Sequence, residues 1–240
     1  MRVLYISDSH LQEWVFTLAD KIMEMYNYDL IVVSGDIVDS HYEQDLYSYS
    51  RMFETCVAFA KKYKSKLIWL YGNHEIPYIY PTVMCSQHCY EAEPLVTEGL
   101  KDLQDALDKS FEVAARVDNV LFSHAGIADH FVCRQFSENP GEEEWDNIIN
   151  YLNHLRFDEL WKPYSPLWYR PNYDFAAPYN RGGCIQVVGH TPVKQPVFES
   201  NILLTDTFWP YGVNCFTVVD TETNKFWYID KELNLIGDVT

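Results

Sequence analysis

Positive charge is scarce in this chain. Its 240 residues include 18 Lys and Arg against 35 Asp and Glu, which gives a formal net charge of −17. Because the phosphate backbone of a nucleic acid is held by clustered Lys and Arg, this balance argues against binding of a nucleic-acid polymer. If the protein binds a phosphate group, a source of positive charge other than clustered Lys and Arg must neutralise it. A bound metal ion can supply that charge locally.

Long apolar runs, a secretory signal and a regular cysteine framework are also missing. The N-terminal "MRVLYISDSH" leads straight into a strand pattern, and no apolar run approaches the length of a membrane span. The six cysteines show no paired spacing, which favours reduced thiols and a cytoplasmic protein without a membrane partner. Cys85, His88 and Cys89 in "CSQHC" could offer three zinc ligands, but their spacing is not a standard one, and a loop with buried thiols is the alternative.

The composition is that of a globular protein. Hydrophobic residues make up 48% of the chain and charged residues 22%. The absence of repeats, low-complexity tracts and linkers predicts a single domain over residues 1–240. Aromatic residues reach 16%, more than a core requires, so some of these rings are expected at the rim of a cleft or an interface.

The first part of the chain alternates between two periodicities. Short apolar runs at 2–7, 29–36 and 66–72 predict buried strands, and apolar residues at helical spacing predict helices over 11–28 and 42–64. A strand–helix–strand–helix–strand order predicts a parallel sheet with right-handed crossover helices, which is an α/β fold.

The second part is less regular. The pattern predicts a loop over 76–97, a helix over 99–118 and a strand over 119–124. From about 127 to 181, an acidic stretch, a helix over 144–162 and a Pro- and Tyr-rich segment predict an ordered cap-like insertion. Four further strands are expected over 184–190, 201–206, 213–220 and 225–230. The last two are expected to form a hairpin.

Polar side chains gather where five of the predicted strands end. The residues are Asp8, His10, Asp36, Asp39, Asn73, His74, Glu75, His124 and His190. Because the carboxyl ends of parallel strands line one crevice, these side chains are expected to meet there. Burying so many ionisable groups without a counter-charge would cost several kcal/mol per charge, and divalent metal ions would supply that counter-charge.

The types of these side chains indicate which metal ions they could bind and which reaction those ions would support. Imidazole and carboxylate without thiolate suit Mn, Fe or Zn. A carboxylate can bridge two such ions, which together polarise a phosphoryl oxygen and acidify a bridging water. The pattern therefore predicts a two-metal site, and such a site explains how a protein of net charge −17 could bind phosphate.

Five ordered motifs resemble those of the calcineurin-like metallophosphoesterases. They are Asp8-x-His10, Gly35-Asp36-x-x-Asp39, Gly72-Asn73-His74-Glu75, His124-Ala125-Gly126 and Gly189-His190-Thr191-Pro192. Within this superfamily they are most similar to the bacteriophage and bacterial Ser/Thr phosphoprotein phosphatases, and the symmetrical dinucleoside tetraphosphatases share much of the pattern. The resemblance implies a four-layer fold of mixed sheets with flanking helices, with the metal site at strand carboxyl ends.

The resemblance also implies roles for individual residues. It assigns two divalent cations, Mn with Fe or Zn as alternatives, to a set of six ligands. These are Asp8, His10 and Asp36 for the first ion, and Asp36 as the bridge with Asn73, His124 and His190 for the second. In the family, the residue at the position of His74 protonates the leaving oxygen and the residue at Asp39 orients it, while Glu75 is expected to be structural.

The sequence departs from the phosphoprotein phosphatase pattern at one position that matters for substrate. Ser40 stands where these enzymes carry an arginine that grips the substrate phosphate. Arg170 in "PLWYRP" matches the position of the family's other phosphate-binding arginine, and the alternative is an arginine stacked on Trp168 or Tyr169. Arg181 is a weaker candidate for the same task.

The leading hypothesis is a phosphoesterase that hydrolyses phosphomonoesters, in particular phosphoprotein, by attack of a metal-bound hydroxide. No nucleophilic side chain accompanies the motifs, so no phosphoenzyme is needed. One alternative is hydrolysis of a nucleotide, either a dinucleoside polyphosphate or a phosphodiester, with the aromatic cap stacking the bases. The non-enzyme alternative is a metal-binding scaffold for protein contacts, and the His74–Asp39 pair argues against it because a scaffold needs no general acid.

Overall fold

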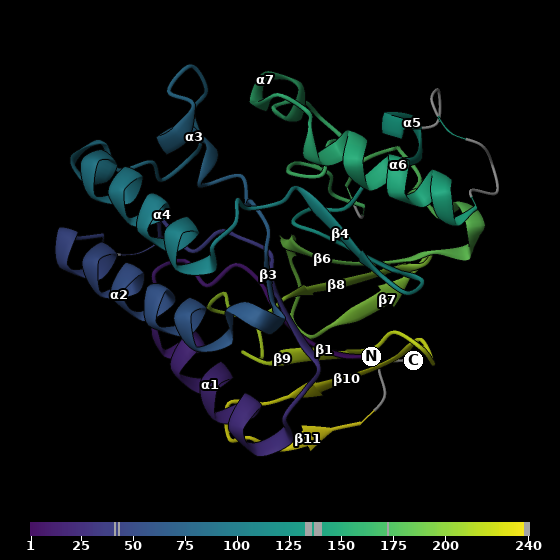
Figure 1. Cartoon of the computed structure of the whole chain (residues 1–240), viewed down its shortest axis with the longest axis horizontal. Helices are drawn as coiled ribbons and strands as arrows, with labels where there is room; N and C mark the ends of the chain where they lie inside the picture. Colours follow the sequence, from purple (N-terminus) through teal and green to yellow (C-terminus); the bar gives the residue numbers. More distant parts are fainter. Residues whose placement is uncertain (41, 43, 133–135, 137–140, 172, 238–240) are drawn as a thin grey trace.

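The computed structural model describes residues 1–40, 42, 44–132, 136, 141–171 and 173–237. Two β-sheets pack face to face and helices cover their outer faces, which gives the expected four layers (Figure 1). The apolar interior between the sheets includes Tyr5 of one sheet stacked on Phe122 of the other, with ring centroids 5.8 Å apart. The α/β fold with two mixed sheets is therefore confirmed.

The first sheet has six strands in the order β11-β10-β9-β1-β2-β3. Their bounds are β1 (Arg2–Ile6), β2 (Leu30–Val33), β3 (Leu67–Trp69), β9 (Phe216–Asp220), β10 (Lys225–Ile229) and β11 (Leu235–Ile236). β1, β2 and β3 are parallel, whereas β9 runs antiparallel to β1 and forms the predicted hairpin with β10. Helices α1 (Trp14–Tyr26), α2 (Leu46–Tyr63) and α4 (Glu93–Leu107) cover its outer face (Figure 1).

The second sheet has five strands in the order β4-β5-β6-β8-β7. Their bounds are β4 (Ala114–Val117), β5 (Val120–Ser123), β6 (Ile185–Pro192), β7 (Val197–Glu199) and β8 (Ile202–Asp206). β5, β6 and β8 are parallel, and β4 and β7 flank them as antiparallel edge strands. Helix α6 (Glu142–Asn153) packs Trp145 and Ile148 against Leu121 of β5.

The predicted helix over 99–118 is wrong in its second half. Helix α4 ends at Leu107 because Asp108 adopts a left-handed backbone, with φ of 61°, and caps the helix with its own N–H. The residues Phe111, Val113, Ala114 and Ala115 that follow are all buried. Ala114 and Ala115 begin β4, which is buried on both faces at that end and pairs antiparallel with β5.

Two other predicted boundaries also differ from the structure. The predicted helix over 144–162 is split into α6 and a short α7 (Phe157–Leu160), whose start is fixed by a capping interaction between Arg156 and Glu159. The predicted loop over 76–97 contains a short helix, α3 (Ile76–Ile79), and the first turn of α4. Pro94 lies in that first turn, where its missing N–H has no intrahelical partner to lose.

The predicted cap over 127–181 holds α5 (Asp129–Val132), α6 and α7, together with part of the short 3₁₀ turn over Arg181–Gly183. Two other 3₁₀ turns lie over Lys64–Lys66 and Tyr90–Ala92. The division of the chain into one domain with a cap stays a prediction.

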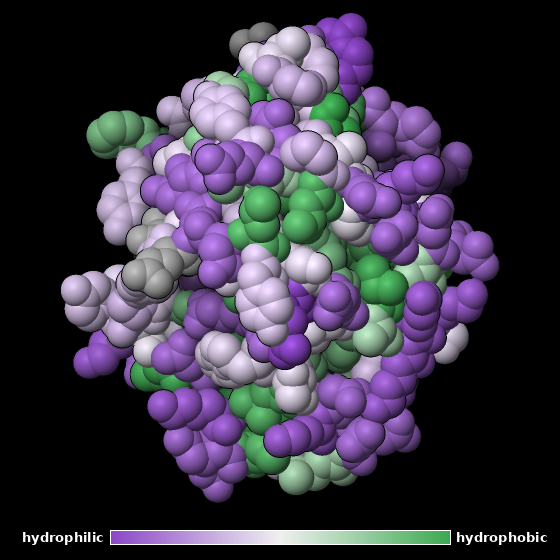
Figure 2. Space-filling view, turned by 90° about the vertical axis from the view of Figure 1, so that its left-hand side faces the viewer, coloured by the Kyte–Doolittle hydropathy of each residue, from purple (hydrophilic) through white to green (hydrophobic). Residues whose placement is uncertain are grey.

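The face of the molecule that Figure 2 shows is mostly hydrophilic, with hydrophobic residues in small separate patches. The chain carries 53 ionisable Asp, Glu, Lys and Arg side chains, the sum of 35 and 18, so a largely charged surface is expected. In the described part of the chain, no helix combines the length and the apolar character that crossing a membrane requires. The five cysteines that the structure describes are free.

Candidate active site

The loops after β1, β2, β3 and β5 meet the middle of β6 at one place. Backbone hydrogen bonds join them, from Asp8 to Gly35 at 3.2 Å and from Gly189 to His124 at 2.8 Å. Gly189 is required at this approach, because a Cβ there would lie 2.0 Å from a carboxylate oxygen of Asp8. The sequence motifs that follow separate strands are therefore neighbours in space.

Several motif residues adopt left-handed backbones. Asp8, His10, Asp36, Asp39 and His190 have φ between 42° and 59°. Such conformations are uncommon outside glycine, although Asp, Asn and His tolerate them best, and they persist where the surroundings fix them. Other left-handed residues occur elsewhere in the described chain, but these five all belong to the sequence motifs, and their surroundings hold them in this conformation.

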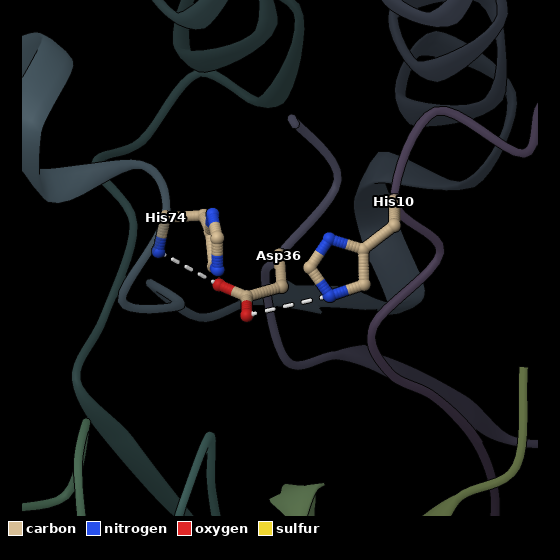
Figure 3. A group of neighbouring side chains, drawn as sticks. All are labelled: His10, Asp36 and His74. Atoms are coloured by element: carbon tan, nitrogen blue, oxygen red, sulfur yellow. Dashed lines mark hydrogen bonds and ion pairs between the residues drawn. The ribbon is translucent and has the colours of Figure 1, made fainter. Parts of the chain in front are cut away.

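Asp36 lies at the centre of this region. Its Oδ2 is 3.8 Å from Nε2 of His10 and 3.4 Å from Nε2 of His124. Its Oδ1 accepts the backbone N–H of His74 at 2.9 Å, and Figure 3 shows the carboxylate between His10 and His74. Burial raises the pKa of Asp36, but the positive charges of His124 and His74 more than offset this and hold it well below its usual range. Asp36 is therefore an ionised carboxylate.

Two groups of ligand-capable side chains share Asp36. Among the described residues, atoms of His10, Asp36 and His74 lie within 4.8 Å of one another, and so do atoms of Asp36, His124 and His190. The second group contains three of the four residues expected to hold one cation. A carboxylate common to two groups has the arrangement that a bridging ligand requires.

In the second group, hydrogen-bond acceptors face one another at short distances. Nδ1 of His124 lies 2.8 Å from the carbonyl oxygen of Ser34, which can only accept, so this nitrogen donates its proton. The other nitrogen, Nε2, faces Oδ1 of Asn73 at 2.8 Å and Nδ1 of His190 at 3.1 Å. In the metal-free protein a proton on Nε2 of His124 can be shared with these acceptors, and a bound cation would take the place of that proton.

The pKa values of His124 and His190 are shifted in opposite directions. Burial lowers the pKa of His124, but the Asp36 carboxylate more than offsets it and raises the value to about 9. Burial and the charges of His124 and Arg170 hold the pKa of His190 well below its usual range, so its ring is neutral. Nε2 of His190 is buried without a hydrogen-bond partner among the described residues. A neutral imidazole with an orphaned nitrogen fits a metal ligand.

The carboxylate of Asp8 lies in the same region, next to the backbone of His190. Both of its carboxylate oxygens lie 3.0 Å from the backbone N–H of His190, and only 2% of the residue is exposed. Asp8 is not a member of either group defined by the 4.8 Å distance, whereas His74, expected to be the general acid, is a member of one. The donor set of carboxylates, imidazoles and one amide oxygen fits two divalent cations.

Glu75 holds the loops together. Its Oε2 accepts the N–H groups of Gly72 at 2.8 Å and Asp36 at 2.9 Å, and its Oε1 accepts that of Ile37 at 2.8 Å. The loops approach so closely that a Cβ on Gly35 would lie 2.0 Å from the backbone nitrogen of Gly72. Glu75 therefore fixes Asp36 through its backbone, as expected of a structural residue.

His74 is paired with Asp39. Nδ1 of His74 lies 2.9 Å from Oδ2 of Asp39, which is fully buried. Oδ1 of Asp39 accepts hydrogen bonds from the hydroxyls of Tyr49, at 2.8 Å, and Tyr78. Burial lowers the pKa of His74, but the charge of Asp36 and the hydrogen bond to Asp39 raise it well above its usual range. The ring therefore keeps a proton that it could deliver.

The two arginines considered for phosphate binding lie in different surroundings, as does Ser40, which stands where the family has a further arginine. Nη1 of Arg170 donates to the carbonyl oxygen of His190 at 2.7 Å, which places the guanidinium beside the candidate ligands. Arg181 instead pairs with Asp129, with Nε 2.9 Å from Oδ1. Ser40 is buried, and its hydroxyl accepts the backbone N–H of Tyr42 at 3.1 Å.

A model of the calcineurin-like phosphoesterase family matches residues 1–215. This chain belongs to the calcineurin-like phosphoesterases. It is accordingly a metal-dependent hydrolase that acts on phosphoester bonds. The matched range includes all the motif residues from Asp8 to His190, so the resemblance inferred from the sequence is confirmed.

Solved structures share the fold of this phosphoesterase. A cold-active protein-tyrosine phosphatase of a Shewanella species matches with a TM-score of 0.69 and 14% sequence identity, over 100% of this chain and 80% of that chain. A protein serine/threonine phosphatase from Saccharomyces cerevisiae matches with a TM-score of 0.52 and 15% identity, over 98% and 78% of the two chains. A comparison with curated proteins found no match.

The sequence did not reveal every side chain at this site. Tyr49 comes from α2 and Tyr78 from α3, and no motif marks either as a partner of Asp39. Cys85 lies 3.5 Å from Nε2 of His74, although the sequence suggested it only as a zinc ligand. His88 of that suggested zinc site instead faces Glu93 at 2.9 Å, and none of the metal-capable groups among the described residues contains it.

Proposed function

We propose that this phosphoesterase is a two-metal phosphatase that hydrolyses phosphomonoesters on protein side chains. The observation that carries the proposal is the position of Asp36, whose carboxylate belongs to both groups of ligand-capable residues. One cation would be held by Asp8, His10 and Asp36, and the other by Asp36, Asn73, His124 and His190. Mn is the metal proposed, because imidazole, carboxylate and amide oxygen without thiolate suit it, and Fe or Zn would suit the imidazoles as well.

When bound, the cations supply Lewis-acid polarisation of the phosphoryl oxygen and acidify a water molecule. The protein supplies the remaining groups. Arg170 binds the phosphate through N–H groups other than the one that it donates to His190. As the bond between phosphorus and the leaving oxygen breaks, Nε2 of His74 gives its proton to that oxygen, and Asp39 stabilises the charged ring through Nδ1.

The choice of a phosphoprotein substrate is supported by what is known of the similar folds. Both structural neighbours with a TM-score above 0.5 reported above are protein phosphatases, one for tyrosine and one for serine and threonine. The lack of an arginine at Ser40 predicts weak binding of the phosphate itself, so contacts with the rest of the substrate must supply affinity. A protein substrate offers such contacts over a wide surface.

Hydrolysis of a nucleotide is the second candidate. Tyr173 and Phe175 follow Arg170 closely in the chain, and both rings are exposed, at 71% and 105%. Exposed aromatic rings can stack on nucleobases. This feature favours a dinucleoside polyphosphate or another nucleotide as the alternative substrate.

Mn-loaded protein assayed on a panel of substrates would separate these candidates. The panel contains phosphoserine and phosphotyrosine peptides, p-nitrophenyl phosphate, bis-p-nitrophenyl phosphate and diadenosine tetraphosphate. The proposal predicts the highest kcat/KM for a phosphopeptide. A higher kcat/KM for the diester or the dinucleotide would contradict it and favour the nucleotide alternative.

A further inference from the structure

The sulfur of Cys85 contacts two residues of the candidate active site at once. Sγ lies 3.2 Å from Nδ2 of Asn73 and 3.5 Å from Nε2 of His74. Cys85 belongs to neither group of ligand-capable residues. It is contributed by the segment between α3 and α4, which the motifs of the family do not include. A side chain outside the motifs therefore joins a proposed metal ligand to the proposed general acid.

The contact matters because the amide of Asn73 can face either way. Its two ends have nearly the same shape, and its hydrogen-bond partners decide which end points where. Only the oxygen can bind a cation. In the structure, Oδ1 points toward Nε2 of His124 at 2.8 Å, and Nδ2 points away from the site toward the sulfur. Asn73 is 2% exposed, so in the folded protein Nδ2 depends on a neighbouring protein atom for its hydrogen-bond partner.

The chemistry of the thiol favours this orientation. A thiol has one proton to donate and lone pairs with which to accept. When Nε2 of His74 is unprotonated, the S–H of Cys85 donates to it, and the sulfur can only accept from Asn73. When Nε2 carries a proton, the sulfur accepts that proton too. In both states the sulfur offers lone-pair density to the amide N–H of Asn73.

We propose that Cys85 is a positioning residue whose sulfur accepts the amide N–H of Asn73 and so keeps the amide oxygen turned toward the second cation. The inference rests on the proposed two-metal function. It assigns Cys85 no contact with metal or substrate. Outer hydrogen-bond partners of metal ligands typically change metal affinity by about 10–100-fold when they are removed, and Cys85 is expected to act within that range.

Titration of the metal-stripped full-length protein with Mn²⁺ would test this by calorimetry. The wild type is expected to bind two ions. In Cys85→Ala, one ion should bind about 10–100-fold more weakly and the other as in the wild type, because only one ion has Asn73 as a ligand. Cys85→Ser retains an acceptor and should restore most of the affinity. A general loosening of the structure would instead weaken both ions.

Matched variants make the result interpretable. Cys89→Ala removes a thiol from the same segment, and the contact of Cys89 with Tyr78 uses its backbone N–H, so both ions should bind normally. Cys85→Val removes the acceptor but fills the space that alanine would leave empty. It should therefore weaken binding of the same ion, and it provides the test if the cavity in Cys85→Ala impairs folding.

Two outcomes would count against different claims. Unchanged binding of both ions in Cys85→Ala and Cys85→Val, with two ions bound by the wild type, would overturn the role of Cys85 alone. Failure of the wild type to bind two ions would overturn the two-metal function itself, and the role of Cys85 with it.

Discussion

Nδ1 of His74 and Oδ2 of Asp39 lie 2.9 Å apart, and Asp39 is held in place by two tyrosine hydroxyls on its other oxygen. A carboxylate can only accept at this contact, so the proton on Nδ1 is fixed and Nε2 is the nitrogen that exchanges protons. This arrangement suits the general acid proposed, but a metal-binding histidine also donates its second ring N–H in this way. The proposed difference in role between His74 and the adjacent Asn73 therefore calls for a direct test.

Replacing His74 tests that difference in role. His74→Asn should leave the metal content near that of the wild type and lower kcat by roughly 10²–10⁴, because the leaving oxygen loses its proton donor. The loss should be smaller for p-nitrophenyl phosphate, whose leaving group departs readily as an anion, than for a phosphoserine peptide. Loss of one metal ion in this variant would show instead that His74 is a ligand, as its distance from His10 and Asp36 would allow.

Arg170 is expected to contribute to substrate binding. Charge-assisted hydrogen bonds from a guanidinium contribute about 1.5–3 kcal/mol, so Arg170→Ala should raise KM for a phosphomonoester by about tenfold or more. A diester, which carries less charge, should respond less. Steady-state kinetics on both substrates would measure this. Arg181→Ala is the matched control, since Arg181 pairs with Asp129, and an equal effect from both variants would argue against a specific role for Arg170.

Metal binding should depend on pH through His124. Its pKa of about 9 in the metal-free protein means that Nε2 holds a proton below that pH, and a cation must displace it. Apparent affinity for the second ion should therefore fall as pH decreases below about 9, by up to about tenfold per pH unit. Calorimetry in buffers of different ionisation enthalpy would also detect the released proton. Affinity that does not change with pH would contradict this view of His124.

The sequence predicted those helices and strands that can be recognised from the spacing of apolar residues in a short stretch of the chain. The parallel strands β1 to β3 follow from short apolar runs separated by helical spacing, and the polar residues after them mark one edge of the sheet. The error over 108–118 has the same origin. The apolar residues from Phe111 onward directly follow a helix whose end depends on the backbone of a single residue, Asp108, and no apolar spacing marks that end.

The partners of the motif residues could not be predicted in this way. Tyr49 lies on α2, and its contact with Asp39 is set by how that helix packs on the sheet. Cys85 reaches Asn73 from a segment without regular spacing. Such contacts arise only when separate elements meet, and no periodicity along the chain encodes them. The proposed ligands could be named because they lie after short apolar strands, or within one in the case of His190, and because their motifs resemble those of a known family.

The shared carboxylate of Asp36 is the basis of the whole proposal, and metal analysis of one matched pair of variants tests it most directly. Elemental analysis of purified wild-type protein should find up to two transition-metal ions per chain. Asp36→Asn should lose metal and activity together, whereas Asp39→Asn should lose activity and keep the metal, since Asp39 pairs with His74 and belongs to neither group of ligand-capable residues. Retention of both ions by Asp36→Asn, or full activity of a chelator-stripped wild type, would contradict the two-metal site.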